Sequence, residues 1–162
     1  MAALLGLGAG GAGAQEPVLG GETPAATTPQ SAWASQCVAD GRSGSLDCSV
    51  FQRVVTQAGQ LVGSVTIRVP PGGTPVMVVS TPLGLYLPNG ITFSIDGGAA
   101  NKLELQTCEQ TGCIATFPVT EEALNAMTRG QKIDIAFANM NRQTITLPLS
   151  LVGFTAAYQR IK

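Results

Sequence analysis

From residue 33 onward, turn-forming residues divide the chain into short apolar or alternating runs. The turns at 70–73, 88–90 and 96–98 read Pro-Pro-Gly-Gly, Pro-Asn-Gly and Asp-Gly-Gly, which are residues typical of tight turns. Short runs at this spacing favour a sandwich or barrel over alternating strands and helices. We therefore expect an all-β fold, an antiparallel β-sandwich-like single domain. The expected strands are 33–38, 46–55, 61–69, 76–80, 83–87, 91–95, 102–108, 113–118, 132–138 and 144–147.

Two of these strands show a clear alternation of apolar and polar residues. In 65–69 and 133–137, the apolar side chains occupy the odd-numbered positions. Successive side chains of a strand point to opposite faces, so alternation indicates a half-buried strand. We expect the odd-numbered residues of both strands to face the core.

One or two short helices interrupt the strands. Thr120 can cap a helix N-terminus, Glu121 and Glu122 suit the positive end of the helix dipole, and Gly130 can end the helix. Apolar residues also recur at helical spacing after Ser150. A second short helix there competes with a final strand.

The chain has four cysteines, an even number. In a chain with features of an exported protein, this favours disulfides over free thiols or a metal site. A zinc site is the alternative, but the spacings x10 and x4 lack the C-x2-C pairs that let two thiolates reach one ion. Four cysteines allow three disulfide connectivities, and we expect the one that joins cysteines close in sequence. The reason is that a turn-like segment lies between the two cysteines of each such pair, 40–44 in the first and 109–112 in the second. The expected disulfides are Cys37 with Cys48 and Cys108 with Cys113.

The first thirty residues differ in composition from the rest. Residues 1–14 are apolar and small, and they end in the A-x-A pattern that signal peptidase cuts after, although a basic n-region is missing. We interpret 1–14 as a signal-peptide remnant that is too short for a transmembrane segment. Residues 15–32, rich in Pro, Gly and Thr, are expected to be a disordered linker, and 33–162 the β-domain.

The composition excludes several function classes. The chain has no histidine, so Ser-His-Asp triads, Cys-His pairs and histidine zinc sites are excluded. Charged residues make up 12% with a net charge of -1 and no basic cluster, which argues against nucleic acid and against an anionic membrane surface as partners. Glu121 and Glu122 are adjacent and cannot share one face, and Lys132 with Asp134 fits a solvated strand face. We expect no enzyme activity, no catalytic residues, no metal and no cofactor.

The most distinctive stretch lies between two prolines and is unusually apolar. As an exposed patch it would contact a protein or lipid partner, whereas a buried strand between two turns is the more common use of such a sequence. The same two interpretations apply to three methionines, which would either form an adaptable contact surface or fill gaps in the core: Met77, Met127 and Met140. The possible interaction segment consists of Pro82, Leu83, Gly84, Leu85, Tyr86 and Leu87.

Several motifs occur together in a characteristic order. They are Trp33 ahead of Cys37, the two cysteine pairs, the segment 76–90, Ile114-Ala115 after Cys113, and the segment 147–154. In this order and spacing, 33–158 resembles the invasion-associated locus B protein family of alphaproteobacteria. The resemblance implies a β-sandwich-like domain with disulfides, secreted to the periplasm or outer membrane. Pathogenic members are linked to entry into host cells, and the family offers no catalytic residues to carry over.

Together these observations lead to one expected function and one alternative. We expect a non-catalytic exported interaction protein of the cell envelope, periplasmic or outer-membrane-associated, with a protein partner in the envelope or on a host surface. The alternative is a periplasmic carrier that binds a small apolar ligand inside the sandwich. The sequence names neither the partner nor the oligomeric state.

Overall fold

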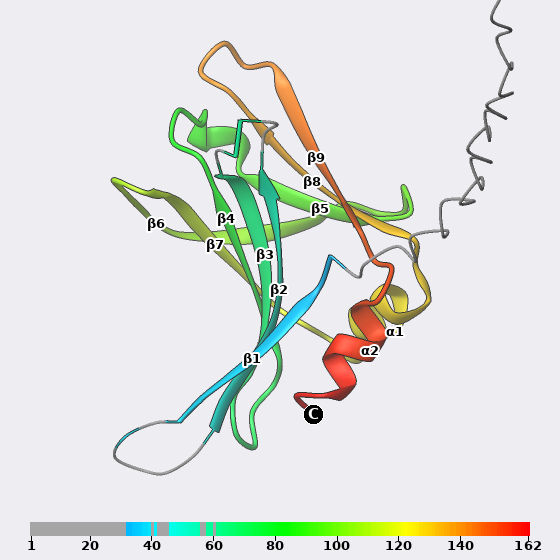
Figure 1. Ribbon diagram of the computed structural model, residues 1–162. Helices are drawn as coiled ribbons and strands as arrows, with labels where there is room; N and C mark the ends of the chain where they lie inside the picture. Colours follow the sequence, from blue (N-terminus) through cyan, green and yellow to red (C-terminus); the bar gives the residue numbers. More distant parts are fainter. Residues whose placement is uncertain (1–31, 40, 42–45, 56–57, 60) are drawn as a thin grey trace, which may run out of the picture. The chain divides into compact units, whose positions relative to one another are not determined.

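The computed structural model describes residues 32–39, 41, 46–55, 58–59 and 61–162 (Figure 1). The expected signal-peptide remnant and nearly all of the expected linker lie outside these residues, as does most of the segment between Cys37 and Cys48. The described strands and helices all belong to one compact unit. In chain order they are β1 (Ala34–Ala39), β2 (Leu46–Val55), β3 (Leu61–Val69), β4 (Val76–Thr81), the 3-10 turn η1 (Leu87–Asn89), β5 (Ile91–Ile95), β6 (Asn101–Glu109), β7 (Gly112–Pro118), α1 (Glu121–Arg129), β8 (Lys132–Ala138), β9 (Thr144–Ser150) and α2 (Phe154–Gln159).

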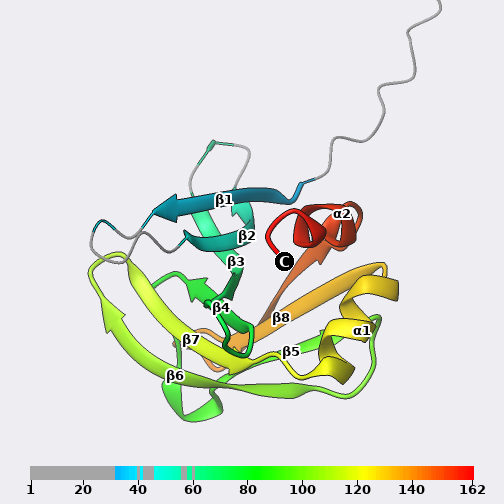
Figure 2. The same ribbon diagram turned by 90° about the horizontal axis from the view of Figure 1, so that it is seen from below.

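The nine strands form one antiparallel sheet in the order β1-β2-β3-β4-β7-β6-β5-β8-β9. The sheet curls, as the view from below shows (Figure 2). Its first strands thereby approach the last, and a Cβ placed on Gly63 of β3 would lie 3.1 Å from Leu147 Cδ1 of β9. This confirms the all-β, sandwich-like expectation, with a single curled sheet supplying both layers.

The interior of the curled sheet is filled by side chains from the inward faces of the strands. Ile67 and Ile135 are fully buried, as the alternation predicts, and Phe93 packs edge to face on Phe117 at 4.9 Å between ring centroids. Burial of this apolar surface is the main stabilising contribution to the fold. Phe154 of α2 adds a fully buried ring to the same core.

The two helices form where the sequence predicts them. The Thr120 hydroxyl accepts a hydrogen bond from the Ala123 N–H at 3.2 Å and so caps α1. α1 ends at Gly130, where a Cβ would lie 2.8 Å from both Ala126 O and Ile95 Cγ2, so only glycine fits this close approach. After Ser150 the structure has the helix α2, which decides against a final strand there.

The expected strand at 83–87 is wrong. Only an isolated bridge between Leu85 and Asn139 forms there, and the segment continues into η1. Gly84 has a φ of 88°, in the left-handed region, which breaks the extended conformation. β4 and β5 are not neighbours in the sheet, so 82–90 is a connection that crosses the end of the sheet from β4 to β5.

The disulfides join Cys37 to Cys48 and Cys108 to Cys113, the local pairs that the sequence favours. In each pair the cysteines face each other directly across an antiparallel ladder, β1 with β2 and β6 with β7. Each disulfide therefore links two neighbouring strands of one hairpin.

Candidate functional site

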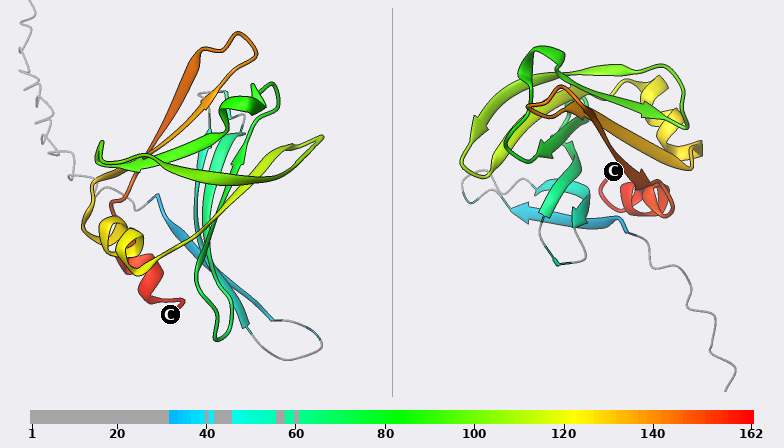
Figure 3. Two further views of the ribbon diagram at one scale, coloured as in Figure 1. Left: turned by 180° about the vertical axis from the view of Figure 1, so that it is seen from behind. Right: turned by 90° about the horizontal axis from the view of Figure 1, so that it is seen from above.

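Apolar side chains are exposed at the end of the sheet where β2, β4 and β8 end. In an antiparallel sheet of this order, the β2–β3, β4–β5, β6–β7 and β8–β9 connections lie at the same end, and Figures 1 and 3 show the β4–β5 and β8–β9 connections there. We call this surface the apolar loop end. It consists of Val55, Leu61, Leu83, Leu87, Met140 and Ile145, with exposed fractions from 36% to 71%.

The β4–β5 connection is fastened to the β8–β9 turn. Leu85 is buried, and next to it the Tyr86 N–H donates to the Ala138 carbonyl at 2.8 Å. This anchor leaves Leu83 and Leu87, on either side of Leu85, exposed to solvent at 54% and 47%. The segment is thus neither a buried strand nor a fully exposed patch.

The β8–β9 turn is ordered by Asn139. Its Oδ1 accepts from the backbone N–H groups of Asn141 and Gln143, both at 3.0 Å, and its own N–H donates to the Gln143 carbonyl at 2.9 Å. Asn is suited to this role because its short side chain bonds the backbone two residues on. The turn presents Met140 to solvent, with 71% of the residue exposed.

The start of β3 joins the same surface from the other side. Leu61 and Pro82 line one small hollow of about 30 Å³ together with Thr111 of the β6–β7 turn. Gly112 in that turn approaches the Thr81 carbonyl so closely that a Cβ would lie 2.2 Å from it. These contacts place the start of β3 and the β6–β7 turn beside the start of the β4–β5 connection.

Charge is nearly absent from the three connections. Arg142 is the one charged residue in the segments 55–61, 82–90 and 139–145. Its guanidinium lies over the Tyr86 ring, 5.0 Å from the centroid, which is cation–π geometry. Arg53, on β2 just before Val55, lies over Phe51 in the same way.

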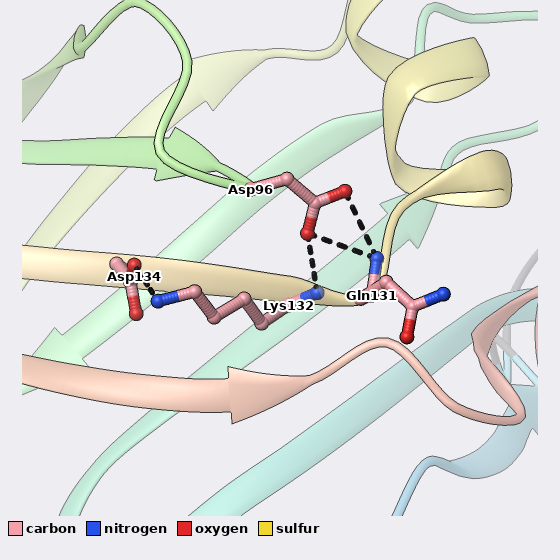
Figure 4. Close-up of polar contacts among 4 residues, drawn as sticks. All are labelled: Asp96, Gln131, Lys132 and Asp134. Carbon is pink, nitrogen blue, oxygen red and sulfur yellow. Dashed lines mark hydrogen bonds and ion pairs between the residues drawn. The ribbon is translucent and has the colours of Figure 1, made fainter.

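Several charged groups elsewhere have structural partners. Lys132 Nζ lies 2.8 Å from Asp134 Oδ2, and the Asp96 carboxylate accepts from the backbone N–H groups of Gln131 and Lys132 at 2.9 to 3.1 Å (Figure 4). Burial raises the pKa of the Tyr158 hydroxyl above its ordinary value of 10.0, so it stays protonated at neutral pH. None of these groups is arranged for acid–base chemistry.

A search of the described residues for metal sites finds no group of three or more His, Cys, Asp or Glu side chains that could hold an ion. Two surface hollows of about 270 Å³ are present. One lies between α1 and the β5–β6 hairpin and includes Ile95 and Phe117, and the other lies beside η1 and includes Thr92 and Phe137.

The family model described as "Invasion associated locus B (IalB) protein" matches residues 33–162, which is the whole of the expected β-domain. The chain belongs to the IalB family. Two Brucella abortus proteins from different strains, each called an Invasion protein B homolog, are 32% identical to it over 107 residues. That match covers 65% of this chain and 62% of theirs, so it spans less than two thirds of their length.

The IalB fold is also seen in a solved structure. The crystal structure of invasion associated protein B from Bartonella henselae superposes with a TM-score of 0.73, covering 80% of this chain and 90% of the other. Sequence identity is 19%, so this likeness supports the fold. The family assignment rests on the family model.

The sequence located part of the apolar loop end. It singled out Pro82–Leu87, and of these Leu83 and Leu87 belong to the surface whereas Leu85 is core. Of the three methionines, Met77 and Met127 are buried and Met140 is exposed. Val55, Leu61 and Ile145 were not identified from the sequence as part of this surface. Val55 and Leu61 could have been identified as apolar residues that flank an uncharged turn.

Proposed function

We propose that this IalB-family chain is a non-catalytic, exported interaction protein of the cell envelope that makes contact through the apolar loop end. The observation that carries the proposal is the cluster of six exposed apolar side chains on three connections that hydrogen bonds and packing hold together. Apolar patches of this kind typically mark interaction sites on proteins. Lys132, Asp134 and Asp96 are engaged in contacts within the fold, and the chain has no histidine, which supports the non-catalytic part of the proposal.

The proposed location is the periplasm or the outer membrane. Two disulfides fit an oxidising compartment, and residues 1–14 fit the remnant of an export signal followed by a linker at 15–32. Within the part of the chain that the structure describes, no helix is long and apolar enough to cross a membrane.

The partner that the sequence leads us to expect is a protein of the envelope or of a host surface. A link to invasion comes from the names of the Brucella and Bartonella relatives, and for this chain it is part of the proposal. The alternative of a carrier for a small apolar ligand has less support, because Phe93, Phe154 and Ile67 fill the interior where that ligand would bind.

Binding to isolated envelopes tests the proposal. The triple variant Leu83→Gln, Leu87→Gln, Met140→Gln removes apolar surface from three exposed positions. The chain offers a matched control in Val38→Gln, Leu46→Gln, Val152→Gln, which changes side chains of similar exposure, 56% to 60%, at the opposite end.

We expect the full-length wild type and the control to co-sediment with envelope membranes and the triple variant to lose most of this binding. Far-UV circular dichroism and thermal unfolding should be the same for all three proteins, because every substituted side chain is solvent-exposed. Equal envelope binding by the triple variant and the wild type would refute the assignment of the apolar loop end.

A further inference from the structure

We propose that the apolar loop end docks on an anionic lipid bilayer, with its leucines and Met140 entering the boundary between headgroups and acyl chains. This inference rests on the proposed function and names the partner of the same surface. It replaces the protein partner expected from the sequence by a lipid surface. It also departs from the composition-based expectation against an anionic membrane, because the fold gathers exposed apolar side chains beside Arg142 and Arg53 at one end of the sheet.

The distribution of the apolar side chains is the first reason. Leu83, Leu87 and Met140 are exposed at 54%, 47% and 71% on two separate connections, with Leu61 on a third. The β4–β5 and β8–β9 connections, which carry Leu83, Leu87 and Met140, lie at one end of the sheet (Figure 3). A bilayer interface accepts separate projecting side chains without a complementary shape, whereas a protein interface needs close packing at its core.

The charges at this end are the second reason. The three connections contain no carboxylate, and their single charge is the cation Arg142, stacked on Tyr86. Tyr and Arg are side chains that place a polar tip among headgroups and an apolar body below. Arg53 adds a second cation nearby, and Glu109, the last residue of β6, is a carboxylate at the same end of the sheet but outside the three connections.

The backbone of the loops is the third reason. A loop that enters the interface must satisfy its own polar groups, because less water is available there. In the β8–β9 turn, the N–H groups of Asn139, Asn141, Arg142 and Gln143 are all bonded within the turn. In the β4–β5 connection the N–H groups of Tyr86, Asn89 and Gly90 are bonded and the two prolines have none, so the β8–β9 turn, and not this connection, carries the argument.

Protein-free vesicles test the inference directly. The full chain is mixed with vesicles of equal parts phosphatidylcholine and phosphatidylglycerol, or of phosphatidylcholine alone, and bound protein is measured by co-sedimentation. We expect the wild type to bind the mixed vesicles. The affinity of the Leu83→Gln, Leu87→Gln, Met140→Gln variant for the same vesicles should be at least about tenfold lower. The Val38→Gln, Leu46→Gln, Val152→Gln control should bind like the wild type.

Arg142→Gln separates charge from apolar insertion. One arginine near an anionic surface contributes about 1 kcal/mol, so we expect about fivefold weaker binding to the mixed vesicles and little change on phosphatidylcholine. Insertion is read from Met140→Trp, whose emission should shift to the blue and be quenched by brominated lipid. Val152→Trp, at the opposite end, should show neither change.

The outcomes distinguish this inference from the proposed function. Residues 1–31 are the same in all variants, so any lipid binding by that segment affects them equally. Equal vesicle binding by the triple variant and the wild type overturns the inference, as does an unquenched tryptophan at position 140. If envelopes bind the protein in a protease-sensitive way while vesicles do not, the partner is a protein, and the proposed function stands without the lipid.

Discussion

Asp96 shows how a single side chain sets the position of a remote segment. It follows β5 with a φ of 50°, a left-handed conformation that Asp adopts more easily than most residues. Its carboxylate then reaches the N–H groups of Gln131 and Lys132, where α1 passes into β8 (Figure 4). The side chain bonds at this junction in the way that a capping residue bonds a helix N-terminus.

We expect Asp96→Ala to lower the free energy of unfolding by about 1 to 2 kcal/mol, because two backbone donors lose a charged acceptor. Asp96→Asn keeps one oxygen acceptor and the tolerance for positive φ, and should lose less than half as much. Urea unfolding followed by circular dichroism measures both. An Asp96→Asn variant as unstable as Asp96→Ala would contradict this account.

At the scale of elements, the two disulfide-linked hairpins differ in how much they constrain the chain. Cys37 and Cys48 are 11 residues apart, and Cys108 and Cys113 are 5 apart. A disulfide stabilises mainly by restricting the unfolded chain, and the effect grows with the length of the closed loop. The β1–β2 disulfide should therefore contribute more, although β1 is an edge strand with little burial.

We expect Cys37→Ala with Cys48→Ala to cost about 3 kcal/mol and Cys108→Ala with Cys113→Ala about 2 kcal/mol of unfolding free energy. Denaturant unfolding of the two double variants measures this order. Peptide mapping of the unreduced wild type provides the control. Crossed pairs or free thiols in that map, or a reversed order of stability, would show that these hairpins are not linked as described.

At the scale of the whole domain, Trp33 connects the two edges of the curled sheet. It precedes β1, and its indole Nε1–H donates to the Ser150 carbonyl at the end of β9, 2.7 Å away. Its ring also packs edge to face on Phe154, which stacks on Tyr158. The first and last strands are thus held together through α2.

Trp33→Phe keeps a ring against Phe154 but removes the hydrogen bond to Ser150. We expect a loss of about 1 kcal/mol, compared with about 3 to 5 kcal/mol for Trp33→Ala, which also removes the packing. Thermal and denaturant unfolding by circular dichroism measure both variants. Equal losses for the two would mean that the hydrogen bond, and not the ring, carries the connection.

Much of the fold follows from local sequence. Nine of the ten expected strands form within a few residues of their expected ends, and Thr120 and Gly130 bound α1 as expected. These features depend on neighbours along the chain, namely side-chain alternation, turn residues and helix caps. The expected strand at 83–87 was also inferred from a local sequence pattern. It does not form, because the segment has no neighbouring strand with which to pair.

The sequence by itself determined nine of the strands, the turns and α1. It also favoured the local cysteine pairs, and it left the segment that forms α2 open between a helix and a strand. Only the tertiary structure decided that β4 lies beside β7, that β5 lies between β6 and β8, and that Trp33 reaches Ser150. Alternation states which face of a strand is apolar but not which strand lies beside it, since many pairings bury the same faces. The apolar loop end depends on that strand order, because the order brings Leu61, Leu83 and Met140 to one end.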